Sequence, residues 1–303
     1  MPDGGSPGGI GTLTPLAAAL CDLKRLRDAS SPDSLASRAF RRAWGELMAG
    51  APALDIALGV TADALTATRL GGIDAGVLKH LGVDAEAIGR VLHAAFQEAA
   101  VGLSPQSRGP LANSLSQPKD VAGLPDFAER LLRQPRAGAT APGKPRIVLE
   151  PPENHGEHCV IVAVLGVVLS GVYGADPATV FLAGLSHHLH NAALPDSGFA
   201  GEVLLGDELA PLMRRLFERE LATLAGHSIK QPVRAALATI GDADTPEGRA
   251  FNAADVIDRV LQMRHYDRVA AFTVDQALDD LELVHAGPLQ AFHQIVLREA
   301  GLP

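Results

Sequence analysis

The chain has 303 residues, of which 47% are hydrophobic and 20% are charged, and its formal net charge at pH 7 is −9. This composition is typical of a globular protein, and the length is sufficient to bury the core of one large domain or two smaller ones. The acidic balance and the 4% content of aromatic residues argue against a nucleic-acid binder, which needs a basic face and stacking platforms.

Cysteine usage and the apolar segments bear on localisation. The two cysteines, Cys21 and Cys159, are too few for a disulfide framework, which favours a reducing compartment. Residues 1–11 are rich in glycine and proline and lack the regions of a signal peptide, so we expect a disordered tail over residues 1–12. The longest apolar run, residues 160–172, is too short to span a bilayer. We therefore expect a soluble, cytoplasmic protein with no membrane partner.

Alanine and leucine at helical spacing dominate the sequence, and the alternation typical of strands is nearly absent. Residues 102–122, rich in Ser, Pro, Gly, Asn and Gln, predict a loop. Residues 134–145 contain three prolines and two glycines and no apolar period, which predicts a linker with a boundary near residue 140. Before this linker we expect helices over residues 13–27, 34–48, 53–65, 84–99 and 125–133.

After the linker the predicted helices are denser and give an all-α bundle. They cover residues 156–171, 177–192, 202–225, 230–240, 246–265 and 273–299, the last interrupted near Gly287. The chain thus divides into a helical N-terminal region of open role, residues 13–140, and a helical domain, residues 141–303. An Ala/Leu-rich helical surface is compatible with a homodimer.

Histidines gather at two places in the second part of the chain. His155 and His158 lie at the start of one apolar helix, and His187, His188 and His190 lie at the end of the next. Burying imidazoles is costly unless they have partners, and a metal ion is one such partner. The alternative is that these histidines lie on the surface or cap the last turn of a helix.

A carboxylate completes the pattern. Asp255 lies among apolar residues of a later predicted helix, where it either faces a site or forms an ion pair with Arg259 one turn away. Other charged residues close to the motifs in sequence are Asp196, Glu202 and Glu157. Lys144 and Arg146 precede the first histidines and are candidates to meet an anion.

This arrangement resembles the HD-domain superfamily of metal-dependent phosphohydrolases. The segment Glu157-His158-Cys159-Val160 is similar to the first-histidine motif of the family, His187-His188 to its His-Asp step, and Asp255 to its terminal aspartate. The separations are 29 residues from His158 to His187 and 67 from His188 to Asp255. The resemblance covers roughly residues 150–300 and implies an HD-like helical bundle there.

The resemblance implies that His158, His187, His188 and Asp255 bind a divalent metal ion: Mn, Fe, Zn, Co or Mg. Two departures from the family pattern stand out. The namesake aspartate is His188, which brings no negative charge, and the glutamate of the nucleotidase-like branch is Asn191, which is no general base. Asp196 matches a later acidic position of that branch, so Asp196 and Glu157 are the catalytic candidates.

Three functions remain open at this stage. The first is a metal-dependent hydrolase of a phosphoester or nucleotide, acting on a small anionic substrate through a metal-activated water. The second is an HD-type di-iron oxygenase, with His155 and His190 each three residues from a predicted ligand and thus on the same helix face. The third is a binding or scaffold module that has lost catalysis. The number of bound metal ions separates the three.

Overall fold

The structure is a computed structural model that describes residues 9–115, 123–269 and 273–303. Within these residues the fold is all-α, as predicted, and the extended contacts are isolated bridges. The first part of the chain forms α1 (Ile10–Asp22), α2 (Leu35–Met48), α3 (Ala53–Leu70), α4 (Ala75–His80), α5 (Ala85–Ala99), η1 (Ala100–Gly102), α6 (Pro105–Asn113) and α7 (Asp126–Arg133). The second part forms α8 (His155–Tyr173), α9 (Pro177–Ser186), η2 (Leu189–Ala192), α10 (Gly198–Leu205), η3 (Gly206–Glu208), α11 (Leu209–Ala222), α12 (Lys230–Thr239), α13 (Pro246–Val269), η4 (Gln276–Asp280) and α14 (Gln290–Glu299).

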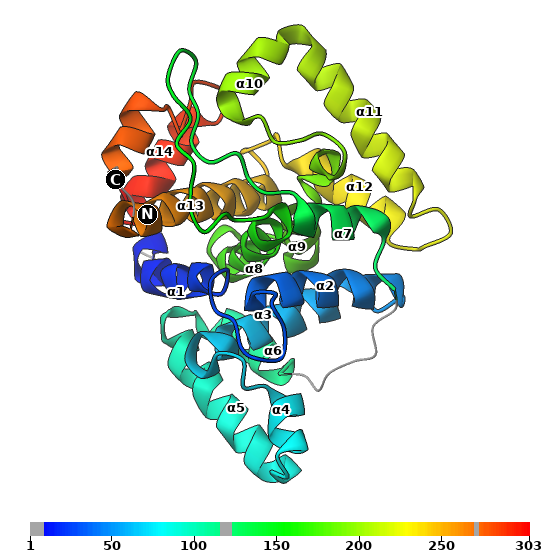
Figure 1. Ribbon diagram of the computed structural model, residues 1–303. Coiled ribbons are helices and arrows are strands. Elements are labelled where there is room, and N and C mark those ends of the chain that lie inside the picture. Colours follow the sequence, from blue (N-terminus) through cyan, green and yellow to red (C-terminus); the bar gives the residue numbers. More distant parts are fainter. Residues whose placement is uncertain (1–8, 116–122, 270–272) are drawn as a thin grey trace, which may run out of the picture.

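The helix α8 lies at the centre, with α9 and α13 on one side and α2 on the other, while α4–α5 and α10–α11 project at opposite ends (Figure 1). It is buried without interruption from His155 to Ser170. By length and composition it is the one described helix that could cross a membrane, yet 83% of its apolar window is buried within the protein. That burial on all faces is the pattern of a core helix.

A capping box starts α8 and so sets the position of its first turn. The side chain of Asn154 accepts from the backbone N–H of Glu157, and the Glu157 carboxylate accepts from the backbone N–H of Asn154. At the other end, Gly174 takes the left-handed conformation, with φ +69°, and ends the helix.

The pair α8 and α9 packs at very short range. A Cβ added to Gly184 of α9 would lie 2.5 Å from the Cα of Ala163 on α8, which is closer than carbon atoms approach without overlap. A residue without a side chain is therefore required at this crossing. The contact brings the N-terminal end of α8 beside the C-terminal end of α9.

One hydrophobic core runs through both predicted regions of the chain. It includes Phe40 and Trp44 of α2 together with Val162 of α8 and Phe181 of α9, all fully buried. Helices of residues 13–140 therefore pack directly on the helices that carry the histidines.

The segment predicted as a linker is folded against the second part of the chain. Ala139 pairs with Ile147 in a β-bridge, and Ala139 and Ala141 are buried. Their small cluster includes Tyr266 and Met263 of α13. Residues 134–153 thus form a loop that covers one end of α13, because small and apolar side chains among the prolines find a surface to bury.

Some predicted elements differ from the observed ones. Ile10 is buried and begins α1, inside the segment predicted as a tail, and α4 was not predicted. The predicted loop 102–122 contains α6, which Ser104 caps and Pro105 begins. Predicted helices 177–192 and 202–225 are broken, the first after Ser186 and the second at Gly206 with φ +50°, whereas the interruption predicted near Gly287 is present between η4 and α14. Residues 1–8, 116–122 and 270–272 of the predictions lie outside the described part of the chain.

Candidate metal centre

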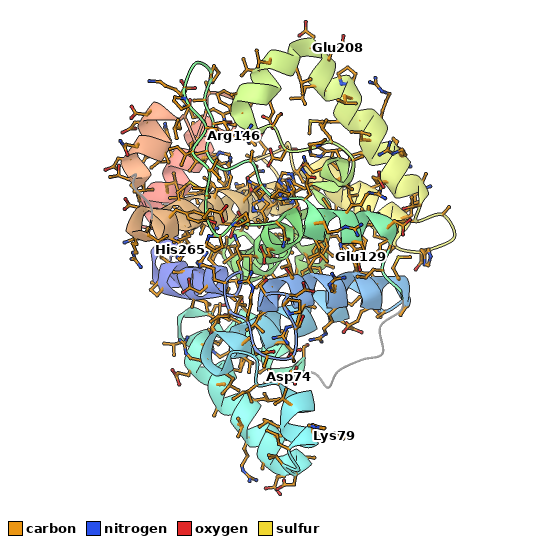
Figure 2. All side chains as sticks on the ribbon, in the orientation of Figure 1. Asp74, Lys79, Glu129, Arg146, Glu208 and His265 are labelled. Carbon is orange, nitrogen blue, oxygen red and sulfur yellow. The ribbon has the colours of Figure 1, made fainter. Side chains whose placement is uncertain are left out.

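Three histidines meet where α8 begins and α9 ends, and Figure 2 shows nitrogen-bearing side chains gathered in this middle part of the molecule. His158 lies in the first turn of α8, and His187 and His188 directly follow α9. The ring centroids are 5.0 Å apart for His158 and His187 and 4.2 Å apart for His187 and His188. One ring nitrogen of each lies within 4.8 Å of the others. The structure thus brings together the three histidines that were predicted from the sequence as metal ligands.

The hydrogen bonds of these histidines identify their tautomers. In each ring, Nδ1 lies 2.7 Å from an oxygen that accepts, so Nδ1 carries the proton and the Nε2 of the neutral ring is an acceptor. The accepting oxygens are Oδ2 of Asp258 for His158, the carbonyl of Gly184 for His187, and Oδ1 of Asn191 for His188.

Two possible ligand atoms lie close to Nε2 of His158. Nε2 of His187 lies 3.1 Å from Nε2 of His158, which in turn lies 3.3 Å from Oδ1 of Asp255. Facing lone pairs repel each other unless a cation lies among them. Metal–nitrogen bonds of about 2.0–2.1 Å with angles near 90–109° place neighbouring ligand atoms about 2.9–3.4 Å apart. The two separations at His158 fall in that range, and ligand atoms of His158, His187 and His188 lie within 4.8 Å of one another, so this group of histidines fits a divalent metal ion.

Burial favours the neutral form of His155, His187, His188 and His190. It lowers the pKa of His187 to about 3, with His158 as a further cause, and it lowers the pKa of His190 to about 4. Burial also holds the pKa of His188 and of His155 well below the usual range. Neutral imidazoles are the form that binds metal, so His187 and His188 are in the metal-binding form at neutral pH.

Asp255 is ionised beside them. Burial opposes its charge, whereas the adjacent Arg259 guanidinium favours it, and the pKa of the Asp255 carboxyl lies well below its usual range. Nε of Arg259 lies 3.3 Å from Oδ2 of Asp255, so the ion pair considered from the sequence is present. The other oxygen, Oδ1, faces His158. The ion pair and a role at the site are therefore compatible, because each uses a different oxygen.

Arg136, which the sequence analysis did not single out, lies in the loop 134–153 and reaches the centre. Its Nη1 lies 2.8 Å from Nε2 of His188. A guanidinium only donates, so this contact agrees with Nε2 of His188 being an acceptor. His188 is thus engaged by Arg136, and it becomes a metal ligand only when that hydrogen bond opens. Nε2 of His158, by contrast, lies next to both His187 and Asp255.

A second missed group lies on the opposite side of His158. Lys24, just after α1, is 3% exposed and donates to Oδ1 of Asp258 at 2.6 Å and to Oε1 of Glu153 at 2.5 Å. Asp258 and Lys24 were absent from the predicted site because nothing in the sequence near the motifs connects residue 24 with residue 258.

A cavity of about 340 Å³ opens from the centre. Arg136 and Arg259 line it, which places two cations where a negatively charged group of a ligand would enter. Its polar lining further includes His187, His188, His190, Asp196, Glu202, Asp255 and His285. Burial, with the nearby Asp196 as a second cause, raises the pKa of the Glu202 carboxyl.

The two catalytic candidates have different surroundings. Asp196 lines the cavity, and its oxygens accept from the backbone N–H groups of Ala137 and Gly198 at 2.9 Å. Glu157 is buried in the capping box and also accepts from Ser34 at 2.5 Å, away from the residues that line the cavity. Its geometry is that of a helix cap.

Other candidates lie around this cavity. Neither ring nitrogen of His155 has a hydrogen-bond partner among the described residues, and its Nε2 is 3.5 Å from Oδ2 of Asp196. Arg146 donates to the carbonyl oxygens of Ala137 and Ser197, so it ties the loop to the start of α10 (Figure 2). Burial raises the pKa of the Cys159 thiol to about 12, which removes it as a nucleophile at neutral pH.

Comparisons with protein-family models, with curated proteins and with solved structures find no match for this chain.

Proposed function

We propose that the protein is a metal-dependent hydrolase of a phosphoester or nucleotide, in which His158, His187 and Asp255 hold one divalent cation. The observation that supports this proposal best is the position of Nε2 of His158, which lies 3.1 Å from Nε2 of His187 and 3.3 Å from Oδ1 of Asp255, in a group of histidine ligand atoms within 4.8 Å of one another. The resemblance of the same residues to the HD-domain motifs supports it independently.

A bound divalent ion would supply a water of lowered pKa as nucleophile and would polarise a phosphoryl oxygen. The surrounding residues support such a reaction. Arg136 and Arg259 offset the negative charge of a phosphate at the wall of the cavity. Glu202, whose pKa is raised, is suited to donate a proton to a leaving oxygen, and Asp196 is the other carboxylate of the wall.

The first test measures bound metal. The protein is purified without chelator or affinity metal, supplied with Mn²⁺, Fe²⁺ or Zn²⁺, and analysed by elemental mass spectrometry. We expect about one ion per chain, and loss of that ion in His187→Ala and Asp255→Ala. His93→Ala, which changes an exposed histidine of α5, is the matched control and should retain the ion.

The second test measures reaction. The loaded protein is assayed against phosphomonoesters, phosphodiesters and nucleotides, with Asp255→Ala as the inactive control. Absence of bound metal after reconstitution would contradict the hydrolase and leave a helical binding module. One ion without turnover of any phosphoester would contradict the reaction while retaining the centre.

A di-iron oxygenase is the second candidate, and the unpartnered His155 beside Asp196 favours it. These two residues would contribute to a second metal position near His188, whose ring lies 4.7 Å from that of His155. Two iron ions per chain and oxygen consumption on reduction would establish this function, whereas a single ion argues for the hydrolase.

A further inference from the structure

The hydrogen bond at Nδ1 of His158 depends on a carboxylate that is itself held by a lysine. The Lys24 ammonium lies 2.6 and 2.7 Å from the two oxygens of Asp258 and 2.5 Å from Glu153. The exposed fractions of these side chains are 1% for Lys24, 0% for Asp258 and 7% for Glu153. An ammonium has three N–H donors, so these carboxylates occupy it fully.

Without the lysine, this place would itself suit a cation. Ligand atoms of Glu153, His158 and Asp258 lie within 4.8 Å of one another. The two buried carboxylates repel each other unless a positive charge lies between them. The ammonium of Lys24 supplies that charge permanently, from a residue 129 positions before Glu153 and 234 before Asp258.

His158 connects this cluster with the candidate metal centre. Its Nδ1 lies 2.7 Å from Asp258, and its Nε2 lies 3.3 Å from Asp255 and 3.1 Å from His187. A neutral imidazole has a proton on one nitrogen and a lone pair on the other. When His158 is neutral, the acceptor at Nδ1 therefore decides that its lone pair faces Asp255 and His187.

We propose that Lys24 is a positioning residue for the metal centre. Its ammonium holds Asp258 where that carboxylate accepts the proton of His158 Nδ1, and it fills the place where Glu153 and Asp258 would otherwise hold another cation. This inference rests on the proposed function, and it gives the N-terminal region a role at the site. A carboxylate behind a ligating histidine fixes the ring and its tautomer, and removing such a group weakens metal binding by about 10–100-fold.

A purely structural ion pair between the end of α1 and α13 is the competing explanation. Removal of Lys24 would then lower stability but leave the metal centre unchanged. The two explanations differ in the tautomer of His158 and in the dissociation constant for metal, so both are measured on the full chain.

The first experiment uses the unaltered, metal-free protein. Two-bond ¹H–¹⁵N correlation spectra identify which nitrogen of His158 carries the proton, with His158→Gln used to assign the signal. We expect the Nδ1–H tautomer in the parent and its loss in Lys24→Met. A parent spectrum with the proton on Nε2 would overturn the inference, and it requires no variant of Lys24 to fold.

The second experiment measures the dissociation constant for Zn²⁺ by competition with a chromophoric chelator. We expect Lys24→Met to weaken binding about 10–100-fold and Lys24→Arg, which keeps the charge, to weaken it less than Lys24→Met. Arg42→Met is the matched control, because Arg42 also pairs with a buried carboxylate, Glu46, but on α2. The control should lower stability and leave zinc affinity unchanged.

The outcomes separate this inference from the proposed function. Lys24→Met with parental zinc affinity and the Nδ1–H tautomer of His158 would overturn the role of Lys24 while retaining the metal centre. A parent protein that binds no zinc would contradict the proposed function, and the tautomer measured without metal would still decide whether Lys24 orients His158.

Discussion

On the Nδ1 side of His158, buried donors and acceptors are matched, because Lys24 lies between Glu153 and Asp258. On the Nε2 side, His158 faces Nε2 of His187 at 3.1 Å and Oδ1 of Asp255 at 3.3 Å. The same imidazole thus joins a cluster that is complete within the chain to one that we propose to hold a cation. The arrangement of donors and acceptors is therefore a better guide to a binding site than the number of charged residues.

The largest expected effect contrasts the two aspartates of α13. Asp258→Ala leaves the Lys24 ammonium buried with one carboxylate fewer, so we expect a loss of about 3–5 kcal/mol in the free energy of unfolding. Asp255→Ala removes a carboxylate that is 18% exposed, and we expect a loss of about 1 kcal/mol or less. Denaturant unfolding of the two metal-free variants checks this. Equal losses of stability in the two variants would show that the two aspartates do not differ in how they are paired.

The next effect concerns the pH dependence of stability without metal. The pKa of His187 falls from 6.5 to about 3 in the folded state, so the unfolded chain binds more protons between these values. The contribution of a neutral, buried histidine to stability is present in full above pH 6.5. Below that pH, the free energy of unfolding should fall by about 1.4 kcal/mol per pH unit for each histidine whose pKa is lowered in this way. Unfolding free energies at pH 7, 6 and 5 measure the slope. His187→Gln should reduce it, and a flat profile in the parent would contradict the prediction.

A smaller effect separates the helix cap from the site. Glu157→Ala removes half of the capping box and the acceptor of Ser34, and we expect it to cost about 0.5–2 kcal/mol of stability. Zinc affinity should remain that of the parent, because Glu157 does not line the cavity. Calorimetric titration with Zn²⁺ tests this, and a tenfold weaker affinity of the variant would show that Glu157 contributes to the metal site.

The smallest expected effect is the loss of stability on removing an ion pair that is exposed to solvent. Arg90 and Glu86 are one turn apart on α5, and their side chains are 64% and 85% exposed. Arg90→Ala should change the free energy of unfolding by less than about 0.5 kcal/mol. Denaturant unfolding at low and high salt gives the value. A loss comparable to that of Asp258→Ala would remove the distinction between matched buried charges and surface pairs.

The sequence was sufficient to predict the all-α fold, because the helical spacing of alanine and leucine is a local property. It also indicated His158, His187 and Asp255, which the structure brings together. It did not indicate Lys24 or Arg136, since their contacts join residues far apart in the chain. The break after Ser186 was missed because the helical spacing of apolar residues continues through it. The backbone, however, changes from the α-helix α9 to the 3-10 helix η2.

The segment 134–145 illustrates the limit of composition. Its prolines and glycines predict a spacer, but a proline-rich segment without helical period also describes a loop folded over a surface. Only the burial of Ala139 and Ala141 against α13 distinguishes the two. Arg136 was therefore placed in a connection between domains, although it reaches the candidate metal centre.

The crossing at Gly184 has a consequence for the centre, although it contains no functional group. Gly184 is three residues before His187, and Ala163 is five residues after His158. The distance between the facing nitrogens of His158 and His187 is therefore set by how closely the two backbones approach about one turn away. A single methyl group at position 184 would push the two helices apart. It would thereby increase the distance between the His158 and His187 nitrogens without altering either histidine.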